Sequence, residues 1–576
     1  MIHKKGNKIG RGTVLLCAML LLGVTACKTE PIEENRPGVT GENPERTAVV
    51  KLSDAGIEIA GSGCEADGNR LKIKEAGVYE ISGSLSDGSI FVNPGNESEV
   101  QLILNGATIH NETGAALFCK KAAKVTITLA EGSENNLSDG TAYVFEEGED
   151  EPDSTLYAKH DLVINGGGVL TVTSAYKDAV KGKDSLYILG GNVIVDSAED
   201  GIVGRDLLHI AGGNITVEAA ADGIKASNDV DDGLGNIVID GGCFVLTAAE
   251  DGVHSNGNVT ISGGEFKIAS GDDGMHADKM LSIDGESSIL ITKSCEGLEA
   301  LEIVINGGVV DITAGDDGIN AAGGADGSGF GHPGMGMFGE GEGEVTVNGG
   351  IVVVNAEGDG LDSNGNLTIN GGEVTVFGPT GGGNGVLDYG GTFLLNGGAL
   401  FAAGSSDMAQ TPSGTSGQYS LAAVLENRGT VGNTVEVTVN GKTVVAMTVP
   451  KKFNYIVASS KEFVNGAEVT VSVEEKECYS GTLTETVTCF GFSGGMGGFG
   501  GMGGFGNKND GGMRPNFPNG NIPEFPEGEW PQFPEGEWPK FPEGEWPQFP
   551  EGERPQRPED GGAQRPGGRN PKGQQS

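Results

Sequence analysis

Residues 199–226 read EDGIVGRDLLHIAGGNITVEAAADGIKA, a unit framed by an acidic residue and Gly-Ile at Asp200 and again at Asp222. Between these corners lie a short apolar strand, a Gly-Gly step and a second strand. In the second strand Ile215 and Val217 alternate with polar residues, which is the period of a half-buried β-strand. Two short strands joined through glycine corners predict one coil of an all-β repeat.

The unit recurs through the centre of the chain. Its acidic corner stands at Asp178, Asp200, Asp222, Asp251, Asp273, Glu296, Asp317 and Asp359, so successive corners are 22, 22, 29, 22, 23, 21 and 42 residues apart. A strand-rich repeat of this length predicts a parallel β-helix over residues 81–416, with the longer steps as loop insertions at 227–233 and 322–343. A propeller would need repeats about twice as long, and the Leu/Asn pattern of a leucine-rich repeat is absent.

The corner acids predict a metal. Equivalent residues of neighbouring coils lie about 4.8 Å apart. Two carboxylates at that spacing repel by roughly 3.5 kcal/mol at an effective dielectric constant of 20. Oxygen ligands from Asp suit Ca²⁺, and the candidate ligands are Asp178, Asp200, Asp222, Asp229, Asp231, Asp251, Asp272, Asp273, Asp316, Asp317 and Asp359. The alternative for each is a structural turn, because Asp-Gly is also a common turn dipeptide.

A second row lies three positions after each corner and is chemically mixed. Its candidate contacts to a ligand rich in hydroxyls or carboxylates are Lys181, Lys225, His254, His276 and Asn320. A plain solvated row is the alternative. The two neighbouring histidines also have the chemistry of a transition-metal site.

The first 27 residues predict an export signal. A basic start and a short apolar run over 13–24 precede Val24-Thr25-Ala26-Cys27, which resembles a lipoprotein cleavage box. Cys27 would then carry the lipid that anchors the chain to a bacterial membrane, with residues 28–47 as a polar tether. The acidic stretch after Cys27 resembles the surface-export signals of outer-membrane lipoproteins. A secretory signal with an incidental cysteine is the alternative.

Several spaced motifs carry a family resemblance: AGVYEISGSLSDG at 76–88, LILNGA at 102–107, VTITLAEGSEN at 125–135, LVING at 162–166 and YKDAVK at 176–181. In this order they resemble a family of bacterial carbohydrate-binding domains that fold as a right-handed parallel β-helix. The resemblance runs from about residue 49 to at least 320. It implies calcium at the helix surface and affinity for polysaccharides such as cellulose and polygalacturonate. Ala179 departs from the family pattern, which usually has Gly after the corner Asp.

Charge and arginine content exclude some functions. The 576 residues include 37 Lys and Arg against 81 Asp and Glu, a formal net charge of −44, which argues against a nucleic-acid partner. A lyase acting on uronate polymers typically needs an arginine base, and Arg205 is the only Arg between residues 71 and 427. Lys181 or Lys225 could replace it if desolvated. We predict binding without catalysis; a calcium-stiffened adhesive protein is the other alternative.

The remaining segments flank the helix. Residues 48–80 predict an N-terminal β cap, and residues 417–490 a small antiparallel β-module with an Asn440-Gly441 hairpin turn. Cys478 and Cys489 are a possible disulfide. Residues 491–576 become Gly-rich and then Pro-rich, with the octapeptide FPEGEWPQ at 525–532 and further copies. This tail predicts a disordered spacer, or an array of aromatic residues that stack on sugars.

Overall fold

The computed structural model describes residues 45–145, 148, 150–321 and 343–492, and every regular element in them is a β-strand. The export signal with Cys27, most of the tether, the 322–342 insertion and the repeat tail lie outside the described residues. Within the described part, no helix has the length and apolar character needed to cross a membrane.

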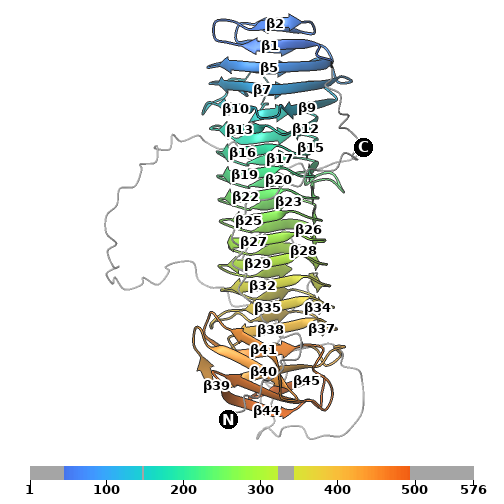
Figure 1. The fold of residues 1–576 in the computed structure, drawn as a ribbon, viewed down its shortest axis with the longest axis vertical. Coiled ribbons are helices and arrows are strands. Elements are labelled where there is room, and N and C mark those ends of the chain that lie inside the picture. Colours follow the sequence, from blue (N-terminus) through green and yellow to red (C-terminus); the bar gives the residue numbers. More distant parts are fainter. Residues whose placement is uncertain (1–44, 146–147, 149, 322–342, 493–576) are drawn as a thin grey trace, which may run out of the picture. The chain divides into compact units, whose positions relative to one another are not determined.

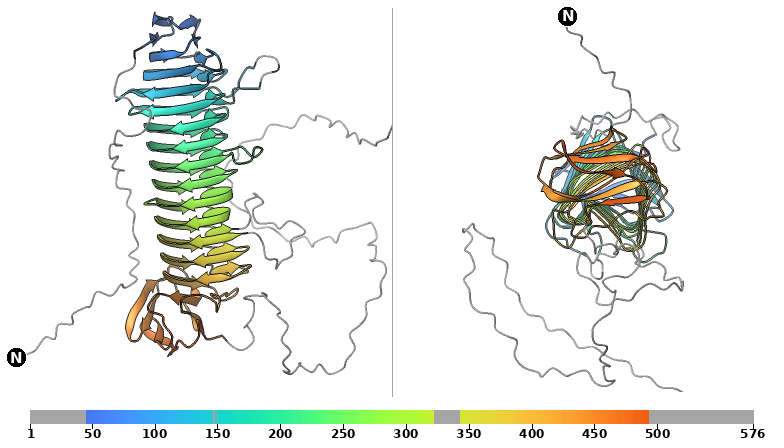
Figure 2. Two further views of the ribbon diagram at one scale, coloured as in Figure 1. Left: turned by 90° about the vertical axis from the view of Figure 1, so that its right-hand side faces the viewer. Right: turned by 90° about the horizontal axis from the view of Figure 1, so that it is seen from below.

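Most strands stack in parallel into a solenoid of coils (Figures 1 and 2). Most coils contribute one strand to each of three ladders, and a few long strands take part in two of them. The first ladder contains β5 (Gly77–Leu85), β7 (Glu99–Asn111), β10 (Glu134–Asp139), β13 (Val169–Ser174), β16 (Asn192–Ser197), β19 (Asn214–Ala219), β22 (Cys243–Ala248), β25 (Glu265–Ala269), β27 (Ser288–Lys293), β29 (Val309–Ala314), β32 (Ile351–Ala356), β35 (Glu373–Phe377) and β38 (Ala399–Gly404).

The second ladder carries the acidic corners. It contains β4 (Arg70–Ile73), β6 (Ser89–Val92), β8 (Leu117–Cys119), β11 (Ser154–Ala158), β14 (Asp178–Gly182), β17 (Ile202–Gly204), β20 (Ile224–Ala226), β23 (Val253–Ser255), β26 (Met275–Ile283), β28 (Leu298–Ile305), β30 (Ile319–Ala321), β33 (Leu361–Ser363) and β36 (Leu387–Tyr389).

The third ladder contains β9 (Lys124–Leu129), β12 (Asp161–Gly166), β15 (Ser185–Ile188), β18 (Leu207–Ile210), β21 (Asn236–Ile239), β24 (Asn258–Ile261), β31 (Glu344–Val347), β34 (Asn366–Ile369) and β37 (Phe393–Leu395). The long strands β26 and β28 turn from the second ladder into the third, since β26 pairs with both β23 and β24. The predicted parallel, all-β solenoid is therefore confirmed, while its right-handed sense stays a prediction.

The core is a stack of aliphatic side chains that point inward from all three ladders. Leu208 on β18 pairs with Ile237 on β21, and both are fully buried, as the alternation in the sequence predicts. The Gly-Gly corners exist because neighbouring coils approach closely there. Gly213 has φ +110°, and a Cβ at this position would lie 2.9 Å from the carbonyl oxygen of Gly191 in the preceding coil.

Different strand pairs flank the solenoid. At the start, β1 (Ala48–Leu52) pairs antiparallel with β2 (Glu58–Gly61), and β3 (Cys64–Asp67) with β4. At the end, β38 pairs antiparallel with β42 (Phe453–Ser459), which also pairs with β39 (Ser420–Gly429). A second sheet contains β40 (Thr434–Val439), β41 (Lys442–Thr448), β43 (Glu468–Val473) and β44 (Lys476–Thr482).

The C-terminal module differs from the expectation in one pairing. Its β40–β41 hairpin turns at Asn440 and Gly441, both with positive φ, as predicted. However, β45 (Val487–Phe490) runs parallel to β39, so the module is not wholly antiparallel. The first sheet of the module extends the last solenoid coil through β42, and the apolar side chains between the two sheets form a second core.

Candidate metal centre

Each corner acid holds the coil that follows it. The Asp251 backbone N–H donates to Asp222 Oδ1 at 2.9 Å, and the Asp273 N–H donates to Asp251 Oδ1 at 2.8 Å. The same bond links Asp178 to Asp200, Asp200 to Asp222, and Asp317 to Asp359. One carboxylate oxygen of each of these acids thus accepts a backbone hydrogen bond from the next coil. This hydrogen bond is structural, but it crosses to the next coil and does not cap the turn of the acid itself.

The glycine after each corner acid completes the contact. The Gly223 N–H donates to the Asp251 carbonyl oxygen at 2.8 Å, and the Gly252 N–H to the Asp273 carbonyl oxygen at 2.9 Å. A Cβ at Gly252 would lie 2.6 Å from the Gly274 carbonyl oxygen. Ala179 keeps the equivalent bond to the Asp200 carbonyl oxygen at 3.1 Å, so the departure from the family pattern does not displace Asp178 from the stack.

At Asp178, Asp222, Asp251 and Asp273 the second carboxylate oxygen contacts the side chain three positions further on. The residues at this position are in register from coil to coil, and we call them the outward row: Tyr157, Lys181, Val203, Lys225, His254, His276, Glu299, Asn320, Asp362 and Asp388. Its chemistry changes along the solenoid from cationic to acidic, so the corner acids have different partners in different coils.

Lysines neutralise the first corners. Lys181 Nζ lies 2.8 Å from Asp178 Oδ2 and 2.7 Å from Asp153 Oδ2. Lys225 Nζ lies 2.7 Å from Asp222 Oδ2 and 3.1 Å from Asp200 Oδ2. Burial alone would lower the pKa of both lysines, but the paired carboxylates outweigh it and raise the pKa above the ordinary value. Both ammonium groups therefore stay charged, and three predicted calcium ligands already have cationic partners.

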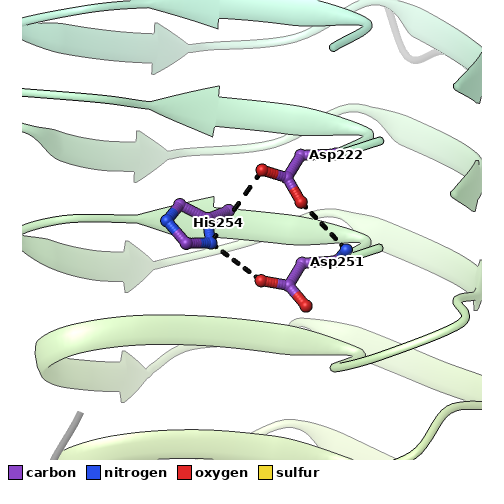
Figure 3. Close-up of side chains that lie close together, drawn as sticks. All are labelled: Asp222, Asp251 and His254. Carbon is purple, nitrogen blue, oxygen red and sulfur yellow. Dashed lines mark hydrogen bonds and ion pairs between the residues drawn. The ribbon is translucent and has the colours of Figure 1, made fainter. Parts of the chain in front are cut away.

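Histidines take over in the next two coils. His254 Nδ1 lies 2.7 Å from Asp251 Oδ2 and 4.0 Å from Asp222 Oδ2 (Figure 3). The His254 and His276 rings stack, with centroids 5.0 Å apart. His276 contacts three carboxylates, from Asp273, Glu299 and Asp278. Burial opposes the charge, yet these carboxylates raise the pKa of His276 to about 12, so it acts as a buried cation.

The last corners lack such a cation. Across the described residues, no Lys, Arg or His forms an ion pair with the carboxylates of Glu296, Asp317, Asp359 or Asp362. Burial, followed by repulsion from neighbouring carboxylates, raises their pKa values: to about 8 for Glu296, about 6 for Asp317, about 7 for Asp359 and about 8 for Asp362. Ionising the carboxyl groups at this end of the ladder is therefore costly unless a cation binds there.

The geometry of these acids fits a shared hard cation. One carboxylate oxygen each from Asp317, Asp359 and Asp362 lie within 4.8 Å of one another, and Asp273, Glu296 and Glu299 form a similar group. Asn320 lies between Glu299 and Asp362 in the outward row. Its Nδ2 donates to Glu296 Oε2 at 2.7 Å, while its Oδ1 is buried without a hydrogen-bond partner. An orphaned amide oxygen beside carboxylates is a donor set that suits Ca²⁺.

A glycine keeps space open next to this group. A Cβ at Gly358 would lie 2.2 Å from Asp316 Oδ1 and 2.3 Å from Asp317 Oδ1. Only glycine therefore lets these carboxylates stand where they are. We define the acidic end of the ladder as Glu296, Asp317, Asn320, Asp359 and Asp362.

Several predicted ligands are not part of these groups. Asp229 and Asp231 lie on the exposed loop between β20 and β21, and Asp231 Oδ2 faces Asn228 and Arg205 instead. Asp272 and Asp316 precede their corner acids, and neither belongs to a group of converging carboxylates in the described part of the chain. In each of the pairs Asp272-Asp273 and Asp316-Asp317, the second residue is the corner acid that lies in the ladder.

Two predicted ligand contacts are covered. The side chain of His276 is 2% exposed, and Asn320 is 6% exposed, so neither presents the surface that a direct sugar contact requires. Lys181, Lys225 and His254 are partly exposed but face corner acids. The sequence reasoning left Glu296, Glu299 and Asp362 out of the candidate site. The three-residue spacing from each corner was the signal for Glu299 and Asp362.

The predicted disulfide is not formed. Cys478 and Cys489 are both free and exposed in the structure. The physical reason is that Cys478 lies on β44 in the second sheet of the module, whereas Cys489 lies on β45, which pairs with β39 in the other sheet.

Comparison with known proteins finds similarity over much of the solenoid. A curated relative from Acetivibrio thermocellus, a carbohydrate-binding domain-containing protein, is 37% identical over 134 residues, 23% of this chain; the chain spans about half, 47%, of that relative. A solved structure of the polysaccharide lyase-like protein from C. thermocellum, in a gadolinium derivative, is 32% identical; the match covers 41% of this chain and 96% of that one, with a TM-score of 0.40. Residues 67–329, most of the solenoid, match the model of a family of carbohydrate-binding domain-containing proteins.

Proposed function

We propose that this chain binds polysaccharide outside the cell, and that Ca²⁺ at the acidic end of the ladder takes part in that binding. The family match over residues 67–329 supports carbohydrate binding at a coarse level. The calcium dependence rests on one observation. Asp317, Asp359 and Asp362 converge without a cationic partner in the described residues, and Asn320, whose Oδ1 is buried without a hydrogen-bond partner, is in register with Asp362 on the neighbouring strand.

The contrast along the ladder supports a cation at this end. Lys181, Lys225 and His276 pair with the corner acids Asp178, Asp200, Asp222 and Asp273 within the chain itself. The outward row then becomes acidic, and among the described residues no Lys, Arg or His pairs with Asp317, Asp359 or Asp362. Bound Ca²⁺ would supply there the positive charge that lysine supplies earlier. A calcium ion with free coordination positions can also accept the carboxylate or hydroxyl oxygens of a glycan.

We propose pectic or other uronate-bearing polysaccharide as the ligand of this site. The chain is strongly acidic, so an anionic glycan needs a bridging cation to approach it. Asp317 and Asp359 are only partly buried, which leaves a metal between them open to an outside ligand.

Absence of catalysis is part of the proposal. The two lysines considered as bases, Lys181 and Lys225, are each held by two carboxylates that raise the pKa of the ammonium group, although burial opposes this. A protonated amine cannot remove a proton. Arg205 contacts Asp206 at 2.8 Å and Asp231 at 3.7 Å, so it is paired away from the ladder. Anchoring through a lipid on Cys27 completes the proposed arrangement.

Binding of polygalacturonate by the full chain, with calcium and with a chelator, tests the proposal. We expect binding with calcium, its loss with the chelator, and no release of unsaturated or reducing-sugar products. Calcium binding without any glycan binding would favour a calcium-stiffened adhesive scaffold. Product formation would mean that the protein is a lyase or hydrolase.

A further inference from the structure

A groove lies over the third ladder in the last coils, where β31, β34 and β37 are neighbours. The strands β34 and β37 lie near the lower end of the solenoid in Figure 1. Its volume is about 390 Å³, within the range of small-ligand sites. The lining residues are Glu344, Thr346, Asn366, Thr368, Thr392, Leu394 and Thr415. All of them lie beyond residue 329, outside the segment that matches the family model.

Threonine hydroxyls dominate this groove. Thr346 on β31 pairs with Thr368 on β34, and Leu394 on β37 continues the same row. Thr392 lies at the start of β37, and Thr415 contributes from the segment that follows β38. None of the four threonine hydroxyls hydrogen-bonds to another group in the described residues, so each keeps one donor and two acceptor positions for a ligand.

The charged and amide groups of the groove are already paired. Asn366 Nδ2 donates to Glu344 Oε1 at 3.3 Å, and Asn366 Oδ1 accepts from the Thr392 backbone N–H at 3.1 Å. Glu344 is the only ionisable residue in the lining, and no cation accompanies it. A uronate carboxylate would find neither a cationic partner nor a cluster of acids able to hold a bridging metal. The groove therefore suits an uncharged ligand.

From this we infer that the groove is a second glycan site, which holds a neutral, hydroxyl-rich segment of polysaccharide without calcium. The inference rests on the proposed polysaccharide-binding function but concerns a different face and a different class of ligand from the acidic end of the ladder. Sugar hydroxyls match threonine hydroxyls in donor and acceptor number, and Leu394 offers an apolar contact for C–H groups. Because neighbouring strands lie ~4.8 Å apart, a polymer that follows the solenoid over this groove meets Thr346, Thr368 and Leu394 on successive coils.

The test uses the full chain, a soluble neutral β-glucan and polygalacturonate, each titrated with calcium and with a chelator. The variant is the double substitution Thr346→Val and Thr368→Val, which keeps side-chain size and strand preference but removes two hydroxyls. The control is Thr260→Val on β24, an outward threonine of the same ladder that lies outside the groove. Melting temperatures of all variants are compared first.

We expect neutral glucan binding that persists in chelator, weakens at least about tenfold in the double variant, and is unchanged by Thr260→Val. Glucan binding that needs calcium, is unaffected by the double variant, or is absent from the parent protein would overturn the inference. Polygalacturonate binding with calcium should be unchanged in the double variant. If the parent protein binds the neutral glucan but not polygalacturonate with calcium, the calcium proposal fails while the groove assignment stands.

Discussion

Lys225 Nζ lies 2.7 Å from Asp222 Oδ2, and it reaches back 3.1 Å to Asp200 Oδ2 in the preceding coil. One ammonium group thus neutralises two stacked acids. At the acidic end, the position that corresponds to Lys225 holds Asn320 or Asp362. A chain-borne cation and a bound cation are therefore alternative solutions to the same repulsion, and the two ends of one ladder allow each to be tested.

Replacing Lys225 with Gln should destabilise the solenoid by about 3 kcal/mol, because two largely buried carboxylates lose their partner. Calcium should recover part of the loss, since the carboxylates of Asp200 and Asp222, left without their lysine, become a new cation site. Thermal melting with and without calcium measures both effects. Lys177→Gln is the matched control, because Lys177 meets Glu199 at 3.5 Å on the exposed surface. Equal destabilisation by both variants would contradict this account.

Asp359→Asn should weaken calcium binding by about tenfold or more, because it removes one charged oxygen ligand. The Asn side chain keeps an oxygen that can accept the backbone N–H of Gly385, so the coil contact is retained. Isothermal titration with calcium gives the affinity directly. Asp229→Asn, on the exposed loop between β20 and β21, should leave the affinity unchanged. A larger effect from the Asp229 variant would show that the metal binds at the loop instead.

The sequence predicted the coils because their signal is local. An Asp-Gly corner and a Gly-Gly step in each repeat suffice to locate the strands, and Asp222 and Asp251 stand one coil apart as expected. The sequence could not predict that one carboxylate oxygen of such an acid accepts a backbone hydrogen bond while the other contacts a side chain. This depends on which backbone N–H of the next coil faces the carboxylate, and that follows from how the coils stack.

Some contacts of the candidate residues could not be expected from short motifs. Asp229 and Asp231 form an acidic loop motif, but Asp231 Oδ2 contacts Arg205 from the preceding coil as well as the nearby Asn228. Cys478 and Cys489 are close in sequence yet belong to different sheets. In a solenoid, neighbours in space are one coil apart in sequence, so short motifs predict contacts poorly unless the repeat register is applied first.

Free thiols at Cys478 and Cys489 lead to a simple expectation. Both cysteines should react with a thiol reagent in the folded protein without prior reduction. Mass spectrometry of labelled peptides identifies the sites. Cys119, which is buried with a raised thiol pKa, should remain unlabelled until the protein unfolds. If Cys478 and Cys489 were labelled only after reduction, the two cysteines would form a disulfide in the folded module.

Stability without calcium should fall as the pH rises from about 4 to about 8. Burial, and then neighbouring carboxylates, raise the folded-state pKa of Asp359 to about 7 and of Asp362 to about 8, while unfolded Asp titrates near ~4. In that window the folded state binds more protons than the unfolded state, so the free energy of unfolding decreases with pH and levels off above pH ~8. Calcium should remove this decline, because it favours the ionised carboxylates, and calcium affinity should rise over the same range. Melting temperatures at a series of pH values, with calcium and with a chelator, measure both trends. The double variant Asp359→Asn and Asp362→Asn should make the chelator curve shallower, and the remaining decline reflects Glu296 and Asp317, whose pKa values burial also raises. A curve as steep as that of the parent protein would assign the titration to other acids.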